Sequence, residues 1–157
     1  MHCINLFALA AAASLLAIAS AGAENLSGWK WSVSGDDTLP YLVFENAARD
    51  ESRFVLICDN QREEASVTVA VADKQARHGQ PVRIDLIGNG QSVAMKGRIA
   101  TDNGVYGHAQ NVPYKTLVTL LRQPGPLTLE LNGRTYMLAE RDRLKQLDTF
   151  ADICKLR

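Results

Sequence analysis

The chain has 157 residues, with 17 basic and 17 acidic side chains, so its formal net charge is zero at pH 7. No run of basic residues stands out, although binding to nucleic acid phosphates or to an anionic membrane surface requires clustered positive charge. We therefore expect neither nucleic acid nor a membrane surface as the partner of this protein.

The first segment, residues 1–23, has the features of a cleavable signal peptide. An uninterrupted apolar stretch precedes Glu24, the first charged side chain. The stretch ends in small residues, and Ala21 and Ala23 form the small-x-small pattern that signal peptidase accepts. The alternative is a retained membrane anchor, but the stretch is alanine-rich and short for a span, which needs about 20 strongly apolar residues. We predict cleavage after Ala23 and a periplasmic or secreted mature protein.

The remaining residues, 24–157, have the size of a single domain. No later segment is long and apolar enough to cross a bilayer, so we expect no membrane span in the mature chain. Strand patterns dominate, because apolar and polar residues alternate with the period of two that indicates a strand with one buried face. The strand-like segments are residues 29–33, 41–45, 53–58, 66–71, 82–86 and 127–131.

Turn signals lie between strand-like segments. Asn-Gly occurs three times, at Asn89-Gly90, Asn103-Gly104 and Asn132-Gly133. This pair favours the two-residue type I′ turn, in which both central residues have a positive φ. The sequence therefore predicts antiparallel hairpins at these positions.

Two helices are predicted beside the strands. The first begins at Pro113, a residue favoured in a first helical turn, and ends before Pro124. The second runs from about residue 140 to 154 and places Leu144, Leu147, Ala151 and Cys154 on one stripe, which we expect to face the core. The predicted fold class is mainly β: an antiparallel β-sandwich or curved sheet with two short helices.

The cysteines predict a disulfide. Cys3 is lost with the signal peptide, so the mature chain holds Cys58 and Cys154, which have one possible connectivity in an oxidising compartment. The alternative is a catalytic cysteine, but no Cys-x-x-Cys is present and neither thiol has a neighbouring histidine to lower its pKa. We predict a structural bond that ties the C-terminal helix to the sheet.

Few residues have the patterns of catalysis or metal binding. Neither histidine of the mature chain, His78 or His108, has a second ligand at metal spacing, so we expect no metal and no cofactor. No serine elbow or phosphate loop is present, and we predict no catalytic residue. One alternative stays open, in which His108 acts as a general base with a carboxylate such as Asp102 folded against it.

Two tryptophans project from the same face of the first strand-like segment. If Trp29 and Trp31 are exposed, they could stack on a sugar or contact a partner. Burial tendency favours the other interpretation, in which both pack over one end of the core.

Several features follow one another in a recognisable order along the mature chain. They are Trp29-x-Trp31-x-Val33, a strand ending in Cys58, Val82-Arg83-Ile84-Asp85, a leucine-rich helix running into a strand over 116–131, and Phe150-x-x-x-Cys154. This arrangement resembles the VasI-like accessory proteins of type VI secretion and similar periplasmic proteins. The resemblance implies a periplasmic β-rich domain and carries over no catalytic residue. Where that family usually has Gly-Leu at the head of the last helix, this chain has Arg143-Leu144.

Two functions follow as hypotheses. The first is an exported, non-enzymatic protein that binds another envelope protein in an accessory or inhibitor-like role. The alternative is a periplasmic hydrolase or carbohydrate-binding protein that uses His108 with Trp29 and Trp31. A pocket that gathers these residues with a carboxylate favours the second hypothesis, and buried tryptophans favour the first.

Overall fold

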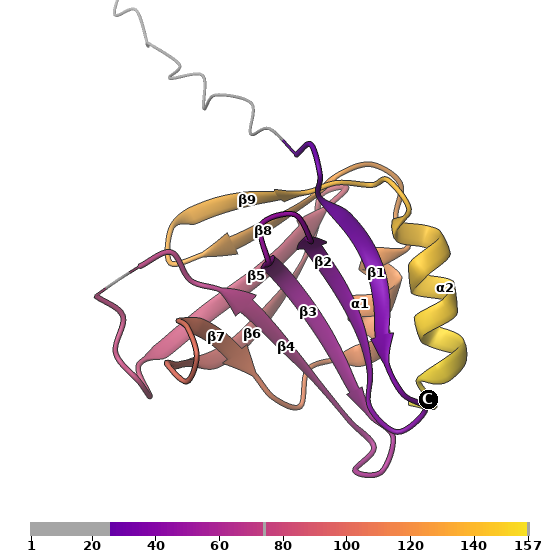
Figure 1. The fold of residues 1–157 in the computed structure, drawn as a ribbon, viewed down its shortest axis with the longest axis horizontal. Helices are drawn as coiled ribbons and strands as arrows, with labels where there is room; N and C mark the ends of the chain where they lie inside the picture. The colour runs from indigo at the N-terminus through magenta and orange to yellow at the C-terminus, as the bar shows by residue number, and fades with distance from the viewer. Residues whose placement is uncertain (1–25, 74, 157) are drawn as a thin grey trace, which may run out of the picture.

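One antiparallel sheet dominates the computed structural model, which describes residues 26–73 and 75–156 (Figure 1). In this part of the chain the nine strands have the spatial order β1-β2-β3-β4-β7-β6-β5-β8-β9. The strands are β1 (Lys30–Gly35), β2 (Pro40–Asn46), β3 (Glu51–Asp59), β4 (Glu64–Ala70), β5 (Pro81–Gly88), β6 (Gln91–Ala100), β7 (Tyr106–Ala109), β8 (Leu127–Leu131) and β9 (Arg134–Leu138). The helices are α1 (Tyr114–Leu121) and α2 (Arg143–Ile153).

The sheet is curled, so that β9 at one edge returns toward β1 and β3 near the other edge (Figure 1). Two hydrogen bonds from side chains of β1 and β3 reach the chain at the end of β9. The indole Nε1 of Trp31 donates to the carbonyl of Ala139 at 2.7 Å, and Nη1 of Arg53 donates to the carbonyl of Met137 at 3.2 Å. We call these two contacts the seam. The mainly β prediction is confirmed, in the form of a curved sheet.

The Trp31 bond of the seam gives a first testable prediction. Trp31→Phe should lower the free energy of unfolding by about 1–2 kcal/mol, because phenylalanine keeps an aromatic ring in the core but leaves the Ala139 carbonyl without its donor. Urea denaturation followed by circular dichroism measures the change. An unchanged midpoint would show that the indole bond contributes nothing to stability.

The core lies on the inner face of the curl, where the alternation of the sequence places apolar side chains. In β4, β5 and β8 the inward positions are all buried and apolar, as the period of two predicts. They are Val67, Val69, Val82, Ile84, Leu86, Leu127, Leu129 and Leu131, with Ala65 and Gly88 at strand ends. Burial of apolar area at about 25 cal/mol per Å² makes this face the main source of stability.

All three Asn-Gly pairs lie between paired antiparallel strands, but only two form the predicted tight turn. Asn89-Gly90 joins β5 to β6 and Asn132-Gly133 joins β8 to β9, each with a positive φ at both residues. Asn103-Gly104 instead lies within a longer loop between β6 and β7. Gly104 has a φ of 138°, outside the type I′ geometry, so the two-residue turn predicted there is wrong.

Helix α1 agrees with the prediction, whereas α2 differs from it in which residues face the core. Helix α1 begins directly after Pro113 and buries its leucines against the sheet. Helix α2 begins at Arg143, after Asp142 in the left-handed region, and its buried residues are Arg143, Leu147 and Phe150. Leu144, which was expected in the core, is 42% exposed, so the predicted stripe is wrong at this residue.

Arg143 replaces Leu144 on the inner stripe because its guanidinium finds partners there. The side chain is fully buried, and Nε donates to the carbonyl of Leu121 at 2.9 Å. Nη2 donates to the carbonyls of Gln123 and Gly125. These carbonyls belong to the C-terminal end of α1 and the following loop, where helical partners are missing. Burial lowers the pKa of Arg143, and nearby Glu140 opposes this shift.

The predicted disulfide between Cys58 and Cys154 is confirmed, with residues 96 positions apart in sequence. Cys58 is buried in β3 and Cys154 directly follows α2. Asn60 supports the same end of the helix, since its Nδ2 donates to the carbonyl of Ile153 at 2.9 Å and its Oδ1 accepts from the Lys155 amide at 2.8 Å. The C-terminal helix is therefore tied to the sheet both covalently and by hydrogen bonds.

Candidate functional site

A hollow of about 540 Å³ on the outer face of the sheet brings together basic side chains from β6, β7 and the β4–β5 connection. We call it the basic hollow. Its lining residues are His78, Gly79, Pro81, Lys96, Gly97, Arg98, Ile99, Ala100, His108 and Gln110. The strands β6 and β7 that carry most of them lie side by side (Figure 1).

Strand alternation explains why the bases of β6 face outward. Val93, Met95 and Ile99 are buried on the inner face, so the even-numbered positions between them, including Lys96 and Arg98, lie on the outer face and are exposed. The register between β6 and β7 then pairs Arg98 directly with His108. Cross-strand partners on one face lie close together, which gathers the two side chains.

Gly97 allows β7 to approach β6 closely at this point. A Cβ added at Gly97 would lie 2.5 Å from the carbonyl oxygen of His108, closer than real Cβ contacts. The absence of a side chain therefore permits the strand spacing that places His108 beside Arg98.

Hydrogen bonds fix the two sides of the basic hollow. His108 Nδ1 lies 3.0 Å from Thr68 Oγ1 on the neighbouring β4, and Nε2 has no hydrogen-bond partner within residues 26–73 and 75–156. Arg98 Nη1 donates to the carbonyl of Gly79 at 2.9 Å, which holds the loop carrying His78 against β6. Backbone bonds between Ile99 and this loop add support. Hydrogen bonds therefore connect both sides of the basic hollow to the sheet.

The ionisable side chains that line the basic hollow are all basic. None of the described residues that line it is aspartate or glutamate. Arg83, which lies opposite Lys96 on β5, is already bound to both carboxylate oxygens of Asp85 at 2.7 and 2.8 Å. Lys96 and Arg98 have no such ion pair within the part of the chain that the structure describes. Two unneutralised cations and two histidines thus face one surface.

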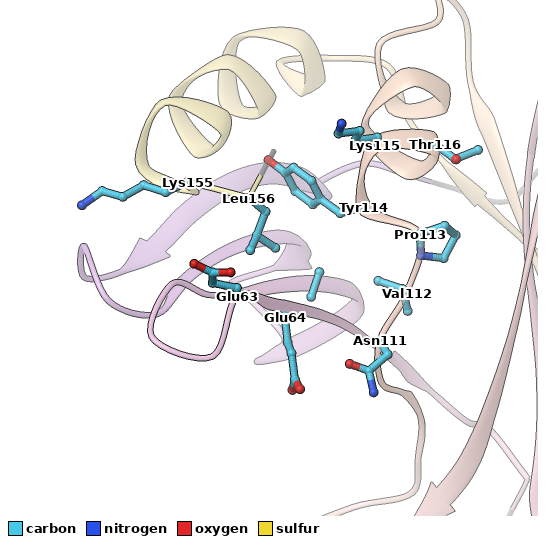
Figure 2. Close-up of a pocket in the computed structure, with 11 residues that line it drawn as sticks. Glu63, Glu64, Asn111, Val112, Pro113, Tyr114, Lys115, Thr116, Lys155 and Leu156 are labelled. Carbon is cyan, nitrogen blue, oxygen red and sulfur yellow. The ribbon is translucent and has the colours of Figure 1, made fainter.

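A larger hollow, of about 730 Å³, lies between the β3–β4 turn, the start of α1 and the C-terminal residues. Figure 2 shows Glu63 and Glu64 on one side, Lys115 and Lys155 on others, and the ring of Tyr114 near Leu156. Burial raises the pKa of the Tyr114 hydroxyl. Because both signs of charge line this hollow, it selects no class of ligand by charge.

The tryptophans lie away from the basic hollow and are buried, which the favoured interpretation predicted. Trp31 is 2% exposed and its only polar group is the seam donor. Trp29 is 8% exposed, stacks on Phe44, and lies under the guanidinium of Arg53 at 4.2 Å from its ring. Neither indole is among the residues that line the basic hollow. The structure therefore does not bring Trp29 or Trp31 together with His108.

The histidine–carboxylate arrangement that was left open is not formed. Asp102 is exposed in the β6–β7 loop, and the bonded partner of His108 is the hydroxyl of Thr68. Among the described residues, no group of three or more histidine, cysteine, aspartate or glutamate side chains could hold a metal ion, and no helix has the length and hydropathy to cross a membrane. The predicted cleavage residues Ala21, Ala23 and Glu24 lie outside the described residues.

Lys96 and Arg98 are the site residues that the sequence analysis missed. A usable signal existed, because residues 92–99 follow the Asn89-Gly90 turn and alternate small or basic residues with Val93, Met95 and Ile99. Such alternation predicts a strand with its bases on the outer face.

Comparison of this chain with protein-family models, with curated proteins and with solved structures finds no match.

Proposed function

We propose that this protein is exported, is not an enzyme, and acts by binding another envelope protein through the basic hollow. Export is supported by the apolar N-terminal stretch and the small residues that follow it. The Cys58–Cys154 disulfide is consistent with an extracytoplasmic protein, because such bonds persist in oxidising compartments.

The observation that carries the proposal is the gathering of Lys96, Arg98 and His108 on the outer face of the sheet. Lys96 forms no ion pair within residues 26–73 and 75–156, so its charge is available to a ligand. Unneutralised charge gathered on one surface is suited to recognition of a complementary partner. The pairing of β7 with β6 and β4 holds this surface in place.

The same geometry gives less support to a hydrolase or a carbohydrate-binding protein. A histidine base is usually oriented by a carboxylate, whereas Thr68 and Arg98 are the neighbours of His108. Sugar binding commonly uses exposed aromatic rings, and both tryptophans are buried. We therefore favour binding over catalysis.

Site-specific photo-crosslinking tests the proposal. A photoreactive amino acid in place of Gln110 should give a covalent adduct with one partner in intact cells, because this exposed residue lines the basic hollow and leaves Lys96 and Arg98 in place. The matched control carries the same group in place of Lys145, an exposed base on α2. The adduct at position 110 should fall at least about tenfold when Arg98→Gln is added, since a charge-assisted contact is lost.

The outcomes are distinct. Equal adducts at positions 110 and 145 would indicate nonspecific contact, and no adduct at position 110 would show that the basic hollow is not the contact site. Mass spectrometry of the adduct identifies the partner. A partner confined to the cytoplasm would contradict the proposed export.

A further inference from the structure

The donors of the basic hollow are suited to carboxylates, and we infer that it binds a short acidic peptide segment of the partner through glutamate or aspartate side chains. This inference rests on the proposed function, because it names the chemistry recognised at the same surface. The observation behind it is that Lys96, Arg98, His78 and His108 line one hollow whose described lining has no acidic residue.

Lys96 and Arg98 supply the permanent charge. They lie two residues apart on the outer face of β6, and both are exposed. Arg98 uses Nη1 to hold the Gly79 carbonyl, which orients the guanidinium and leaves its other N–H groups to face a ligand. A planar guanidinium beside a flexible ammonium matches carboxylate oxygens, because charge-assisted bonds to such oxygens are short and strong.

His108 adds a directional donor next to Arg98. Thr68 Oγ1 lies 3.0 Å from Nδ1, and when this hydroxyl donates to Nδ1 the ring carries its proton on Nε2. Nε2 has no hydrogen-bond partner among the described residues, so it can donate to a ligand. A carboxylate at this place favours that tautomer.

Small residues give the basic hollow room for a side chain. Gly79, Gly97 and Ala100 are among its lining residues, and none of them projects more than a methyl group. The volume of about 540 Å³ exceeds what one carboxylate side chain fills, so two neighbouring acidic residues of a peptide can enter.

The surroundings favour a short acidic segment over a polyanion. Arg83, the next base across the sheet, is neutralised by Asp85, and Glu130 lies opposite Asp85 on β8. The Glu130 carboxylate repels the continuous negative charge of a nucleic acid or an anionic bilayer. The net charge of the chain is zero, so no long-range attraction compensates. Attraction for an acidic ligand is thus confined to the basic hollow.

Titration of the purified, oxidised ¹⁵N-labelled protein with a capped hexaglutamate peptide tests the inference by nuclear magnetic resonance. Amide shifts should concentrate at Lys96, Arg98 and His108, and the apparent Kd should rise with salt because the contact is ionic. Lys96→Gln should weaken binding about tenfold, and Lys145→Gln on α2 should leave it unchanged. Arg98→Gln is a second variant, in which the amide spectrum reports whether the loop at Gly79 stays ordered.

Three results would overturn the inference: no shift at the basic hollow, equal binding by Lys96→Gln, or tighter binding of inorganic phosphate or of phosphatidylglycerol vesicles than of the peptide. The crosslinking experiment separates this failure from failure of the proposed function. An adduct at position 110 without hexaglutamate binding retains the contact site and rejects its acidic specificity. Hexaglutamate binding without any adduct at position 110 rejects the proposed function.

Discussion

Replacing both Cys58 and Cys154 with serine should lower the free energy of unfolding by about 3–5 kcal/mol. The bond closes a loop between residues 96 positions apart, and a cross-link over such a length strongly restricts the unfolded chain. Equilibrium urea denaturation of the wild type and the double variant measures the difference. The slope of the transition should also increase in the variant, because the unfolded chain without the cross-link is more expanded.

The reduced protein should nevertheless stay folded in the absence of denaturant. Asn60 holds the carbonyl of Ile153 and the amide of Lys155, so the end of α2 keeps polar contacts with the sheet when the bond is absent. Adding a reductant gives the matched control, since it should destabilise the wild type and leave the double-serine variant unchanged. A difference below about 1 kcal/mol would contradict the assignment of a stabilising role to the disulfide.

Arg143→Met should lower the free energy of unfolding by about 3 kcal/mol. Methionine fills much of the same volume, but it leaves the carbonyls of Leu121, Gln123 and Gly125 without their donor. Hydrogen bonds to a charged group are worth about 1.5–3 kcal/mol each. Part of this gain is offset in the wild type, because the guanidinium is buried and its Nη1 has no partner among the described residues.

Arg141→Met is the matched control for this prediction. The Arg141 side chain is 86% exposed and its ion-pair partner among the described residues is its neighbour Asp142, so its replacement should change the stability by less than about 0.5 kcal/mol. Arg143→Lys should recover little, because an ammonium group cannot reach three carbonyls that a planar guanidinium spans. Urea denaturation of the three variants ranks them. Equal stability of Arg143→Met and Arg141→Met would show that the buried bonds contribute nothing net.

The position of Arg143 also shows where sequence reasoning fails. Hydrophobic periodicity placed Leu144 on the inner stripe of the last helix, since a leucine is usually buried and an arginine usually exposed. In the structure the arginine is buried and the leucine is exposed, because three carbonyls at and after the end of α1 accept hydrogen bonds from the guanidinium. A partner supplied by another element leaves no trace in the local pattern, so this exchange could not be predicted.

Short-range features were predictable for a physical reason. Asn89-Gly90 and Asn132-Gly133 set positive φ values through their own residue types, and the alternation of 82–86 and 127–131 reports burial directly. Apart from the pairs joined at Asn-Gly, the neighbour of each strand was not predictable, because alternation states which face is buried and says nothing about which strand lies alongside. The outer-face grouping of Lys96, Arg98 and His108 depends on the pairing of β7 with β6 and β4.

The spatial order of the strands has a consequence for the speed of folding. Strands β1 to β4 form a run of successive hairpins, and β5–β6 and β8–β9 are hairpins as well, so most pairings are local in sequence. Two pairings within the described sheet are non-local: β4 pairs with β7 across the β5–β6 hairpin, and β5 pairs with β8 across β6, β7 and α1. Local contacts form fast and non-local contacts form slowly, because the entropy cost of closing the intervening loop must be met before a non-local contact can stabilise the chain. We therefore expect the rate-limiting step to be the formation of these two pairings, β7 with β4 and β8 with β5, with the local hairpins already formed.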